Sequence, residues 1–542
     1  MNRNIYFFVL LLSVNIFTTT KAVEIDSNTL VCVVNTSLQS CQSIQLQVET
    51  CPSTVSCISY LQQTVQNNPS YTTTVVVLAD GLNYNDCPGT IIGLPESYIH
   101  VFVGGSNSVY QCNGPFANIN LSYKTDIVFE GFTLIGGGYS GSFNGGLVSV
   151  TYSGVNGSPN LEFVNTTISE ASVKSNGGCI YSDGMVVSVI NSTIFSCIAQ
   201  NNGGAIATAE GSDIVTITNS NISMNTAYNY AGAIYASILN VNNSTFSENT
   251  GAIIAGALYV SNFLSIQNST FYKNVGSSVG NAYGGAIYFN GQMSSIVGTK
   301  FIQNIVLGMG SGGSIYANYL TLQNCEFSDD SAYYGGSIYS ISSLNMENCT
   351  LVGSRATMYG GAIFANGNVN IRNSSFTGST AYSGGAIYTS NAGYYNMIED
   401  SQFFNNVAKT GGAIYSKQTS SYYFSGSLFN ANSATIQGGA MYFGGGGYPT
   451  MLYGGKFIGN TNKVNQLYDT FNSNVFSNVN TVNVSTDIIT SNTLYSVPLV
   501  IDNSLAYPVA YGVLGECYNG IATITTSGQV TSCQCFPNYS VI

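Results

Sequence analysis

The chain has few charged residues and few of the side chains that enzymes most often use for chemistry. Only 7% of its 542 residues are charged, Trp is absent, and His100 is the single histidine. It has three arginines, Arg3, Arg355 and Arg372, and a formal net charge of −12. Since phosphate backbones are bound by clustered cations, this composition argues against a nucleic-acid partner.

Long apolar runs are equally scarce. The stretch Ile5 to Phe17 follows Arg3 and precedes the small residues Thr20 and Ala22, which fit the −3 and −1 positions of a cleavage site. It is too short to cross a bilayer, and no other run reaches about 18 apolar residues. We therefore expect a signal peptide at 1–22, no transmembrane segment, and a secreted or cell-surface product.

Cysteine, by contrast, is well represented, with 13 residues. In a secreted chain these cysteines predict disulfides. Six of them precede the repeats described below and allow 15 pairings, among which the sequence does not choose: Cys32, Cys41, Cys51, Cys57, Cys87 and Cys112.

The central part of the chain repeats one imperfect motif, Gly-Gly-small-Ile-aromatic. Counting close variants there are 11 copies, with the second glycines 23 to 29 residues apart. The copies begin at Gly177, Gly203, Ala231, Ala255, Gly284, Gly312, Gly335, Gly360, Gly384, Gly411 and Gly438. Such a fixed period is the signature of a repeat architecture.

A second motif lies between successive copies and reads apolar-x-apolar-x-Asn-Ser-Thr-Phe-x-x-Asn, as in 239–249 and 264–274. Its alternation is that of a strand. Each period then holds three short strands, separated by Asn and Gly, which tolerate tight turns. A leucine-rich repeat would need a helix-like return and a propeller four hairpin strands, so the pattern predicts an all-β, right-handed parallel β-helix of about 12 coils.

Equivalent residues stack on one another in such a fold. An Ile column and a Phe column are expected to fill the core, namely Ile180, Ile206, Ile234, Ile287, Ile315, Ile338, Ile363, Ile387 and Ile414 with Phe246, Phe271, Phe301, Phe327, Phe376, Phe403, Phe429 and Phe457. An Asn column after the second strand is expected to form an amide ladder inside a tight turn: Asn165, Asn191, Asn219, Asn243, Asn268, Asn324, Asn348 and Asn373.

The pattern divides the mature chain into four regions. Residues 23–115 form a Cys-rich N-terminal cap with the first coils, 116–460 the repeats, 461–515 a C-terminal cap or linker, and 516–542 a partial EGF-like segment. Within the first region, Val55 to Gln66 has Ile58, Leu61 and Val65 at helical spacing, which predicts a capping helix.

The two motifs, found between about Asn165 and Asn460, resemble the Gly-Gly-Ala-Ile and Phe-x-x-Asn repeats of the polymorphic outer membrane protein family, within the pectin-lyase-like superfold. That resemblance implies a parallel β-helix and an association with adhesion. The chain lacks the family's C-terminal β-barrel and carries thirteen Asn-x-Ser/Thr sequons, which favours a eukaryotic secretory route.

Catalytic constellations are not evident. Enzymes of this superfold need paired carboxylates or a calcium-binding acidic cluster. Asp329 and Asp330 occupy the Phe-x-x-Asn slot and His100 lies among apolar strand residues, so a structural role is expected for all three. Neither a cofactor nor a metal is predicted.

Three further features are expected to stack in neighbouring coils. Glu347, Arg372 and Glu399 should form a column of alternating charge. Cys325 and Cys349 should be neighbours, either bonded or as free thiols. Outward-facing aromatic residues beside the Ile column form a candidate binding face for glycans or cell-surface proteins, or else a stiffening ladder: Tyr235, Tyr259, Tyr288, Tyr316, Tyr339, Tyr388 and Tyr415, with Tyr181, Phe364 and Tyr442.

The sequons at Asn191, Asn243, Asn268, Asn348 and Asn373 coincide with the expected Asn ladder, whose buried amides could not carry glycans. The predicted glycosylation sites are therefore Asn35, Asn120, Asn156 and Asn483. The function predicted from these observations is non-enzymatic adhesion or glycan or protein binding. The alternatives are a polysaccharide lyase or hydrolase, and a structural spacer of the extracellular matrix or coat.

Overall fold

The computed structural model describes residues 28–462 with short gaps, together with 483–484, 520–524 and 530–535. The gaps are 46–47, 79–82, 93–98, 105–107, 137–139, 142, 155–156, 210–212, 278–279, 391–394, 418–420, 444–447, 454–455 and 459. The signal peptide predicted at 1–22, most of the predicted cap at 461–515 and much of 516–542 lie outside the described residues.

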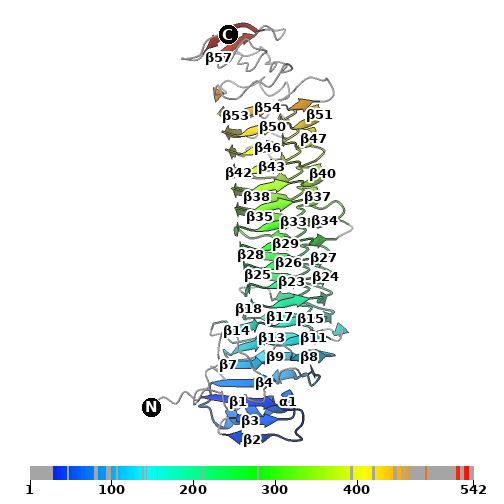
Figure 1. The fold of residues 1–542 in the computed structure, drawn as a ribbon, viewed down its shortest axis with the longest axis vertical. Coiled ribbons are helices and arrows are strands. Elements are labelled where there is room, and N and C mark those ends of the chain that lie inside the picture. The colour runs from blue at the N-terminus through cyan, green and yellow to red at the C-terminus, as the bar shows by residue number, and fades with distance from the viewer. Residues whose placement is uncertain are drawn as a thin grey trace. The chain divides into compact units, whose positions relative to one another are not determined.

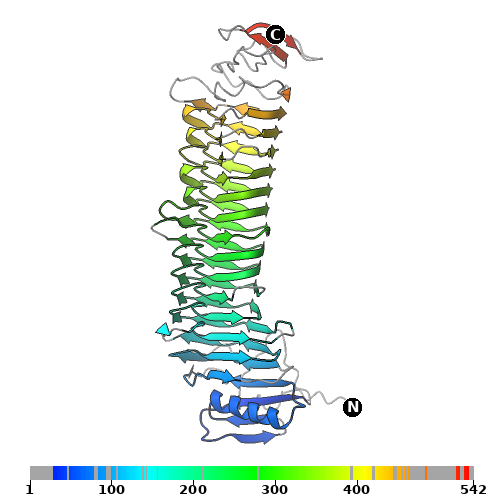
Figure 2. The ribbon, with the colours of Figure 1, turned by 180° about the vertical axis from the view of Figure 1, so that it is seen from behind.

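The described residues form an all-β solenoid of parallel strands with about 13 turns and one helix (Figures 1 and 2). The chain consists of two compact units. The first unit comprises residues 1–252 and 256–263, and the second comprises 253–255 and 264–542. In each unit the strands of the repeats pair in parallel with their counterparts one turn along the chain, so that equivalent residues become neighbours. Among the described strands, the exceptions are β2 (Gln42–Gln45) with β3 (Val48–Cys51), and β57 (Gly520–Ile524) with β58 (Val530–Cys535), which pair antiparallel.

One turn of the first unit shows how the repeat folds. It contains β17 (Ile180–Asp183), β18 (Val186–Ile190), β19 (Thr193–Phe195) and β20 (Ile198–Ala199). The first three occupy the segments where strands were predicted. The two-residue fourth strand was not predicted, because so short a segment carries no alternation.

The strands of the first unit lie in three sheets. Sheet A contains β1 (Thr29–Val34), β2 (Gln42–Gln45), β3 (Val48–Cys51), β4 (Thr73–Leu78), β6 (Gly89–Ile92), β7 (Ile99–Val103), β9 (Ala117–Leu121), β10 (Asp126–Glu130), β13 (Val148–Tyr152), β14 (Asn160–Val164), β17, β18, β21 (Ile206–Thr208), β22 (Ile214–Thr218) and β25 (Ile234–Asn242). Sheet B contains β5 (Asn83–Tyr84), β8 (Val109–Cys112), β11 (Thr133–Gly136), β15 (Thr167–Ser169), β19, β23 (Asn221–Ser223) and β26 (Thr245–Ser247). Sheet C contains β12 (Ser140–Gly141), β16 (Ser172–Val173), β20, β24 (Thr226–Ala227) and β27 (Thr250–Gly251).

The second unit repeats this arrangement. In sheet A lie β31 (Ile287–Phe289), β32 (Met293–Val297), β35 (Ile315–Gln323), β38 (Ile338–Glu347), β41 (Ile363–Ala365), β42 (Asn368–Arg372), β44 (Ile387–Thr389), β45 (Tyr395–Glu399), β48 (Ile414–Ser416), β49 (Ser421–Ser425), β52 (Met441–Phe443) and β53 (Tyr448–Tyr453). In sheet B lie β29 (Thr270–Tyr272), β33 (Lys300–Ile302), β36 (Glu326–Ser328), β39 (Thr350–Val352), β43 (Ser375–Thr377), β46 (Gln402–Phe404), β50 (Leu428–Asn430) and β54 (Lys456–Ile458). The third side contains β30 (Val275–Gly276), β34 (Ile305–Val306), β37 (Ser331–Tyr334), β40 (Arg355–Tyr359), β47 (Val407–Thr410), β51 (Ser433–Gln437) and β55 (Thr461–Asn462).

The predicted core columns are confirmed. Every member of the Ile column is fully buried, as are the Phe residues from Phe246 to Phe429. The Phe rings stack in register; for example, the ring centroids of Phe403 and Phe429 lie 4.6 Å apart and nearly parallel. Burying this apolar area contributes most of the stability, at about 25 cal/mol per Å².

A buried amide ladder exists, but at a different position from the predicted one. It is made by the last Asn of the Phe-x-x-Asn motif, because that residue ends sheet B and points inward. The backbone N–H of Asn406 donates to Oδ1 of Asn432 at 3.0 Å, and Asn432 makes the same bond to Asn460. Each Nδ2 also donates to a backbone carbonyl of the preceding turn, as Asn432 does to Phe403.

The column for which the ladder was predicted, Asn165 to Asn373, turns the chain from sheet A to sheet B. Its members have φ between 46 and 55° and are exposed, except for the half-buried Asn165. The expectation that these amides are buried is therefore wrong. Hydrogen bonds between their side-chain amides do connect some of them. Nδ2 of Asn348, for example, donates to Oδ1 of Asn324 at 2.6 Å.

The predicted helix is present as α1 (Thr54–Asn67). Its N-cap is Ser53, whose hydroxyl accepts a hydrogen bond from the backbone N–H of Ser56 at 3.0 Å. Cys57, Leu61 and Val65 form its buried face, which packs against β1, β3 and β4.

Candidate functional site

The Tyr ladder is the most regular surface feature of the structure. It comprises the residues that follow the buried Ile of each repeat, and period-2 alternation directs them outward. In the second unit the rings of Tyr288, Tyr316, Tyr339, Phe364, Tyr388, Tyr415 and Tyr442 stack with successive centroids 4.6 to 5.2 Å apart. In the first unit Tyr235 and Tyr259 stack at 4.8 Å, while Ala207 interrupts the ladder after Tyr181.

A second tier of tyrosines covers part of this ladder. Tyr359 stacks on Tyr388 at 4.5 Å, and Tyr334 lies 5.7 Å from Phe364. As a result Tyr388 and Phe364 are only 3% and 8% exposed, so the prediction that they face solvent is wrong. The other predicted members, Tyr235, Tyr259, Tyr288, Tyr316, Tyr339 and Tyr415, are half-buried.

Stacking determines which part of each ladder ring a ligand could reach. Both faces of Tyr316 are occupied, by Tyr288 on one side and Tyr339 on the other. Only ring edges and phenol groups remain, so a sugar could not stack on a ring face as an isolated aromatic would allow. Burial raises the pKa of the Tyr316 and Tyr339 hydroxyls, which keeps them as neutral donors. The Tyr339 hydroxyl also accepts a hydrogen bond from Nδ2 of Asn366 at 3.0 Å.

Two carboxyl groups of the first unit, those of Asp183 and Asp213, act electrostatically on each other and on Tyr181 of the ladder, which the sequence did not predict. Asp183 ends β17, and Asp213 precedes β22 in the next turn. Burial raises the pKa of Asp213 to about 6, and the Asp183 carboxylate adds to the effect, although a hydrogen bond from the Gly184 N–H at 3.0 Å opposes it. The same two carboxylates raise the pKa of Tyr181 beyond the effect of burial. The two acids are 30 positions apart in the sequence. Only the register of neighbouring turns brings them near each other, so the sequence carries no sign of this pair.

His100 is placed where a polysaccharide could not reach its ring. Its imidazole lines a cavity of about 30 Å³ beneath α1, together with Leu61, Val65 and Phe102. Nδ1 is hydrogen-bonded to the Thr74 hydroxyl, and burial lowers the pKa of the imidazole to about 4.

The side chains of the adjacent acids Asp329 and Asp330 lie in different environments, one in solvent and one in the core. Asp329 is exposed and occupies the left-handed region with φ of 54°. Asp330 is fully buried and replaces an Asn of the buried ladder, where Oδ1 accepts the backbone N–H of Asn304 at 2.9 Å. Burial raises its pKa to about 8, which makes it a neutral acid at pH 7.

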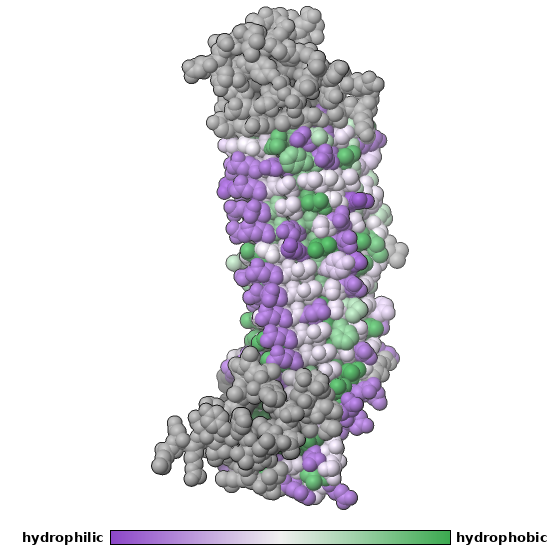
Figure 3. Space-filling model, in the orientation of Figure 1, coloured by the Kyte–Doolittle hydropathy of each residue, from purple (hydrophilic) through white to green (hydrophobic). Residues whose placement is uncertain are grey.

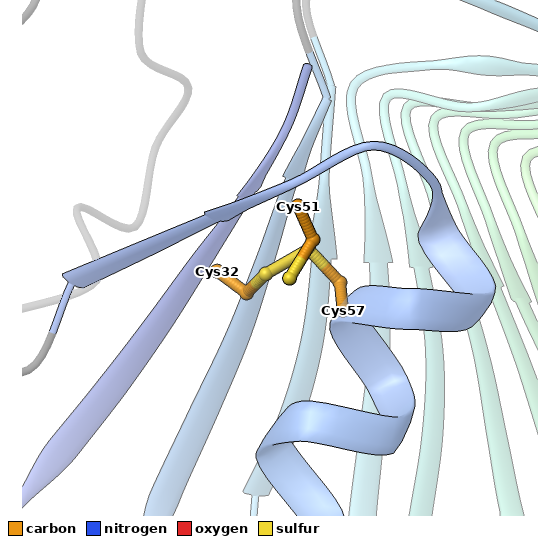
Figure 4. Close-up of side chains that lie close together, drawn as sticks. All are labelled: Cys32, Cys51 and Cys57. Carbon is orange, nitrogen blue, oxygen red and sulfur yellow. A yellow bond between two sulfur atoms is a disulfide. The ribbon is translucent and has the colours of Figure 1, made fainter. Parts of the chain in front are cut away.

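The six N-terminal cysteines form three disulfides, Cys32–Cys57, Cys41–Cys51 and Cys87–Cys112. A fourth bond, Cys179–Cys197, lies within one turn of the repeats. The sulfurs of Cys32, Cys51 and Cys57 lie within 4.8 Å of one another. Figure 4 shows the three side chains gathered beside α1. Because each is already bonded to another cysteine, the group offers no thiolate ligand for a metal.

Cys325 and Cys349 are buried free thiols in neighbouring turns. Of the two predicted states, a disulfide or a pair of free thiols, the structure has the free thiols. The Cys325 backbone N–H donates to Sγ of Cys349 at 3.4 Å. In equivalent turns a serine occupies this position and its hydroxyl accepts the same bond, as Ser374 does from Cys349 at 3.1 Å. The pair thus continues a structural ladder.

The predicted column of alternating charge is present. Glu347, Arg372 and Glu399 are register partners, and Nε of Arg372 lies 2.9 Å from Oε2 of Glu399. Both side chains are partly exposed, so the pair contributes little to stability.

On the face shown in Figure 3, hydrophilic residues gather along one edge and hydrophobic residues are scattered among them.

Two of the predicted glycosylation sites can be placed. Asn35 and Asn120 are both exposed, Asn35 in a loop and Asn120 on β9. Asn156 lies outside the described residues, and for Asn483 the structure describes the backbone alone. No helix among the described residues is both long and apolar enough to span a membrane.

A family model described as the right-handed β-helix region matches residues 285–457. The match covers less than half of the chain and lies within the second unit, where it is similar to that family. No curated protein and no solved structure matches the chain.

Proposed function

We propose that the chain is a secreted or cell-surface β-helix protein that binds an extended glycan along the Tyr ladder. The observation that carries this proposal is the run of half-buried phenols at Tyr288, Tyr316 and Tyr339 in the second unit, whose successive ring centroids lie 4.8 to 5.2 Å apart. An extended peptide repeats its side chains on one face every 6.6 to 6.8 Å, so it would lose register with the phenols after a few residues. A pyranose unit is closer in length to the observed repeat.

The recognition mode follows from the stacking. Phenol hydroxyls, which donate and accept hydrogen bonds, would meet the hydroxyls of successive sugars, while ring edges contact the sugar carbons. The finer features expected from the sequence belong to this proposal: the signal peptide, three principal strands per right-handed coil, the capping role of α1, the likeness to polymorphic outer membrane protein repeats and the EGF-like start at Cys517.

The Tyr ladder can be tested without disturbing its stack. Replacing Tyr288, Tyr316 and Tyr339 together by Phe removes three hydroxyls and keeps the rings, and Phe364 already shows that Phe fits the ladder. Each lost hydrogen bond contributes about 0.5 to 1.5 kcal/mol, so we expect at least about tenfold weaker binding on a polysaccharide array that includes pectins.

The matched control replaces Tyr319 and Tyr395, which are 41% and 55% exposed and lie outside the ladder. Their Phe variants should bind as the parent chain does. All variants should remain folded, and the ladder variant should unfold only slightly earlier, because it loses the hydrogen bond from Asn366 to the Tyr339 hydroxyl. If the ladder variant binds as well as the parent, the hydroxyls do not recognise a ligand, and the spacer function becomes the better explanation.

The Asp183 and Asp213 pair supports a second candidate, a polysaccharide hydrolase. An acid with a raised pKa near a second carboxyl group is the pairing that glycoside hydrolysis uses. In that case Asp213→Asn should abolish release of reducing sugar from a polysaccharide panel, while Asp329→Asn, a change at an exposed acid, should not. Absence of reducing sugar with the parent chain would exclude hydrolysis of those substrates.

A further inference from the structure

The corners between sheets A and B place a column of asparagines in solvent. Eight described corners have Asn, each with positive φ: Asn165, Asn191, Asn219 and Asn243 in the first unit, and Asn268, Asn324, Asn348 and Asn373 in the second. The conformation accounts for the residue type, because Asn tolerates the left-handed region better than most residues. Since seven of these side chains are exposed, their amides are accessible.

The fold also explains the residue that follows each corner Asn. Ser192, for example, is 3% exposed. Its hydroxyl donates to the Ile190 carbonyl at 2.8 Å and accepts the Thr166 N–H at 3.0 Å. Ser220, Ser374 and Ser401 repeat this pattern in other turns. A small side chain with a hydroxyl or thiol is therefore favoured here, as part of a buried ladder that Thr166, Cys325 and Cys349 also join.

The third residue of the sequon, two positions after the corner Asn, has no such structural requirement. It starts each strand of sheet B and accommodates Lys300, Glu326, Gln402 or Leu428 in different turns. Six of the eight Asn corners nevertheless have Thr or Ser there: Thr167, Thr193, Thr245, Thr270, Thr350 and Ser375. Of the four described corners with Gly or Asp (Gly131, Gly298, Asp400 and Gly426), only the first is followed by Thr, at Thr133. A Thr or Ser therefore lies two positions after a corner Asn more often than the fold alone requires.

We propose that these six corner sequons are N-glycosylated: Asn165, Asn191, Asn243, Asn268, Asn348 and Asn373. The co-reactant is an oligosaccharide attached to a lipid pyrophosphate. Nδ2 bonds to C1 of the first sugar and loses a proton, while the bond from C1 to the pyrophosphate oxygen breaks and the lipid pyrophosphate leaves. The inference rests on the secretion that is part of the proposed function.

The native structure can accommodate such glycans. A glycosylated amide keeps one N–H, and one is enough for the observed bonds from Asn348 to Asn324 at 2.6 Å and from Asn243 to Asn219 at 2.8 Å. The glycans would also leave the Tyr ladder open. Tyr339 lies at the start of β38 and Asn348 directly after its end, nine residues away, or about 30 Å along the strand.

The test is site mapping on the full chain secreted from a eukaryotic host. Release of N-glycans by a peptide amidase in ¹⁸O-water converts each occupied Asn to labelled Asp, which peptide mass spectrometry locates. We expect label at the six corner sequons. Thr350→Ala should remove the label at Asn348, and Thr350→Ser should keep it.

One Asn corner and one Gly corner without a sequon, at Asn324 and Gly298, provide a gain-of-site test. Glu326→Thr completes a sequon at Asn324 and should add one glycan, whereas Lys300→Thr, at the glycine corner, should add none. A secreted chain unlabelled at the corner sequons would overturn this inference and leave glycan binding by the Tyr ladder standing. A chain that never enters the secretory route would overturn the secretion as well.

Discussion

At the scale of single residues, Asp330 is the side chain whose environment differs most from its ordinary one. The buried ladder uses both atoms of each Asn amide, one as acceptor and one as donor. An ionised carboxylate has no donor, and Asp330 Oδ2 accepts no hydrogen bond. The neighbouring turns have Ser314 and Ser337 where most repeats have Ala, and hydrogen bonds from these hydroxyls favour the ionised acid, but burial outweighs them and raises the pKa. Asp330 therefore stabilises the ladder only in its protonated form.

Asp330→Asn should stabilise the second unit, because the amide restores the donor. With a pKa near 8 in the folded chain against an ordinary 3.8, the unfolded chain binds fewer protons between these values. Stability of the parent should then fall by up to about 1.4 kcal/mol per pH unit as the pH rises through this window. Urea unfolding at pH 5, 7 and 8.5 measures this slope, which the variant should lack.

The neighbouring acid provides the control. Asp329 is exposed and its replacement by Asn should change neither the stability nor its dependence on pH. Equal slopes for the parent and Asp330→Asn would mean that Asp330 is ionised in the folded chain.

At the scale of the turn, the two glycines of the repeat have different roles. The first has positive φ, and Ala occupies it at Ala231 and Ala255 with φ near 60°. The second is Gly in all 11 copies. A Cβ on Gly336 would lie 2.0 Å from the backbone oxygen of Gly361 in the next turn, which no rotation of a side chain could relieve.

Gly336→Ala should therefore prevent folding of the second unit, because the clash separates two hydrogen-bonded turns. Gly335→Ala should cost less. Its Cβ would also lie 2.1 Å from a backbone oxygen, but this is the Ile338 oxygen of the same turn, and Ala231 and Ala255 show that the turn can shift to admit a Cβ. The left-handed conformation itself costs about 1 to 2 kcal/mol. Yield of secreted protein and the midpoint of thermal unfolding compare the two variants. Equal behaviour would show that the turns can move apart.

What the sequence predicted and what it missed both follow from the repeat. The Ile and Phe columns could be predicted because alternation fixes which side chains point inward. The Asn ladder was assigned to the wrong position, since Asn serves both exposed left-handed corners and buried amide bonds. The pairing of Asp183 with Asp213 and the tier of Tyr334 and Tyr359 over the ladder were missed. The two acids lie in segments of unequal length between the repeat motifs, so no periodicity links them. Tyr334 and Tyr359 do occupy a periodic position, directly before the first residue of a copy, where Tyr230 and Tyr283 also lie.

At the scale of the whole molecule, stability is carried by contacts between neighbouring turns. Deleting residues 336–360 joins Gly335 to Gly361 and removes one turn of the second unit. Ile315 would then face Ile363, and Phe327 would face Phe376, as their neighbours already do. We expect a secreted, folded chain with a β-type circular dichroism spectrum. Deleting residues 336–348 instead removes half a turn and should abolish folding, because sheet A would be joined to the wrong sheet.

The register described for the strands has a consequence for how such a chain changes in the course of evolution. Because each turn presents to the next the same rows of donors, acceptors and side chains, a duplicated or lost segment is tolerated when it comprises a whole number of turns. Length can then vary in steps of one repeat without a new core having to arise. The number of phenols and corner sequons would increase or decrease by the same steps, so the reach of the molecule and the number of its ligand contacts would be inherited together.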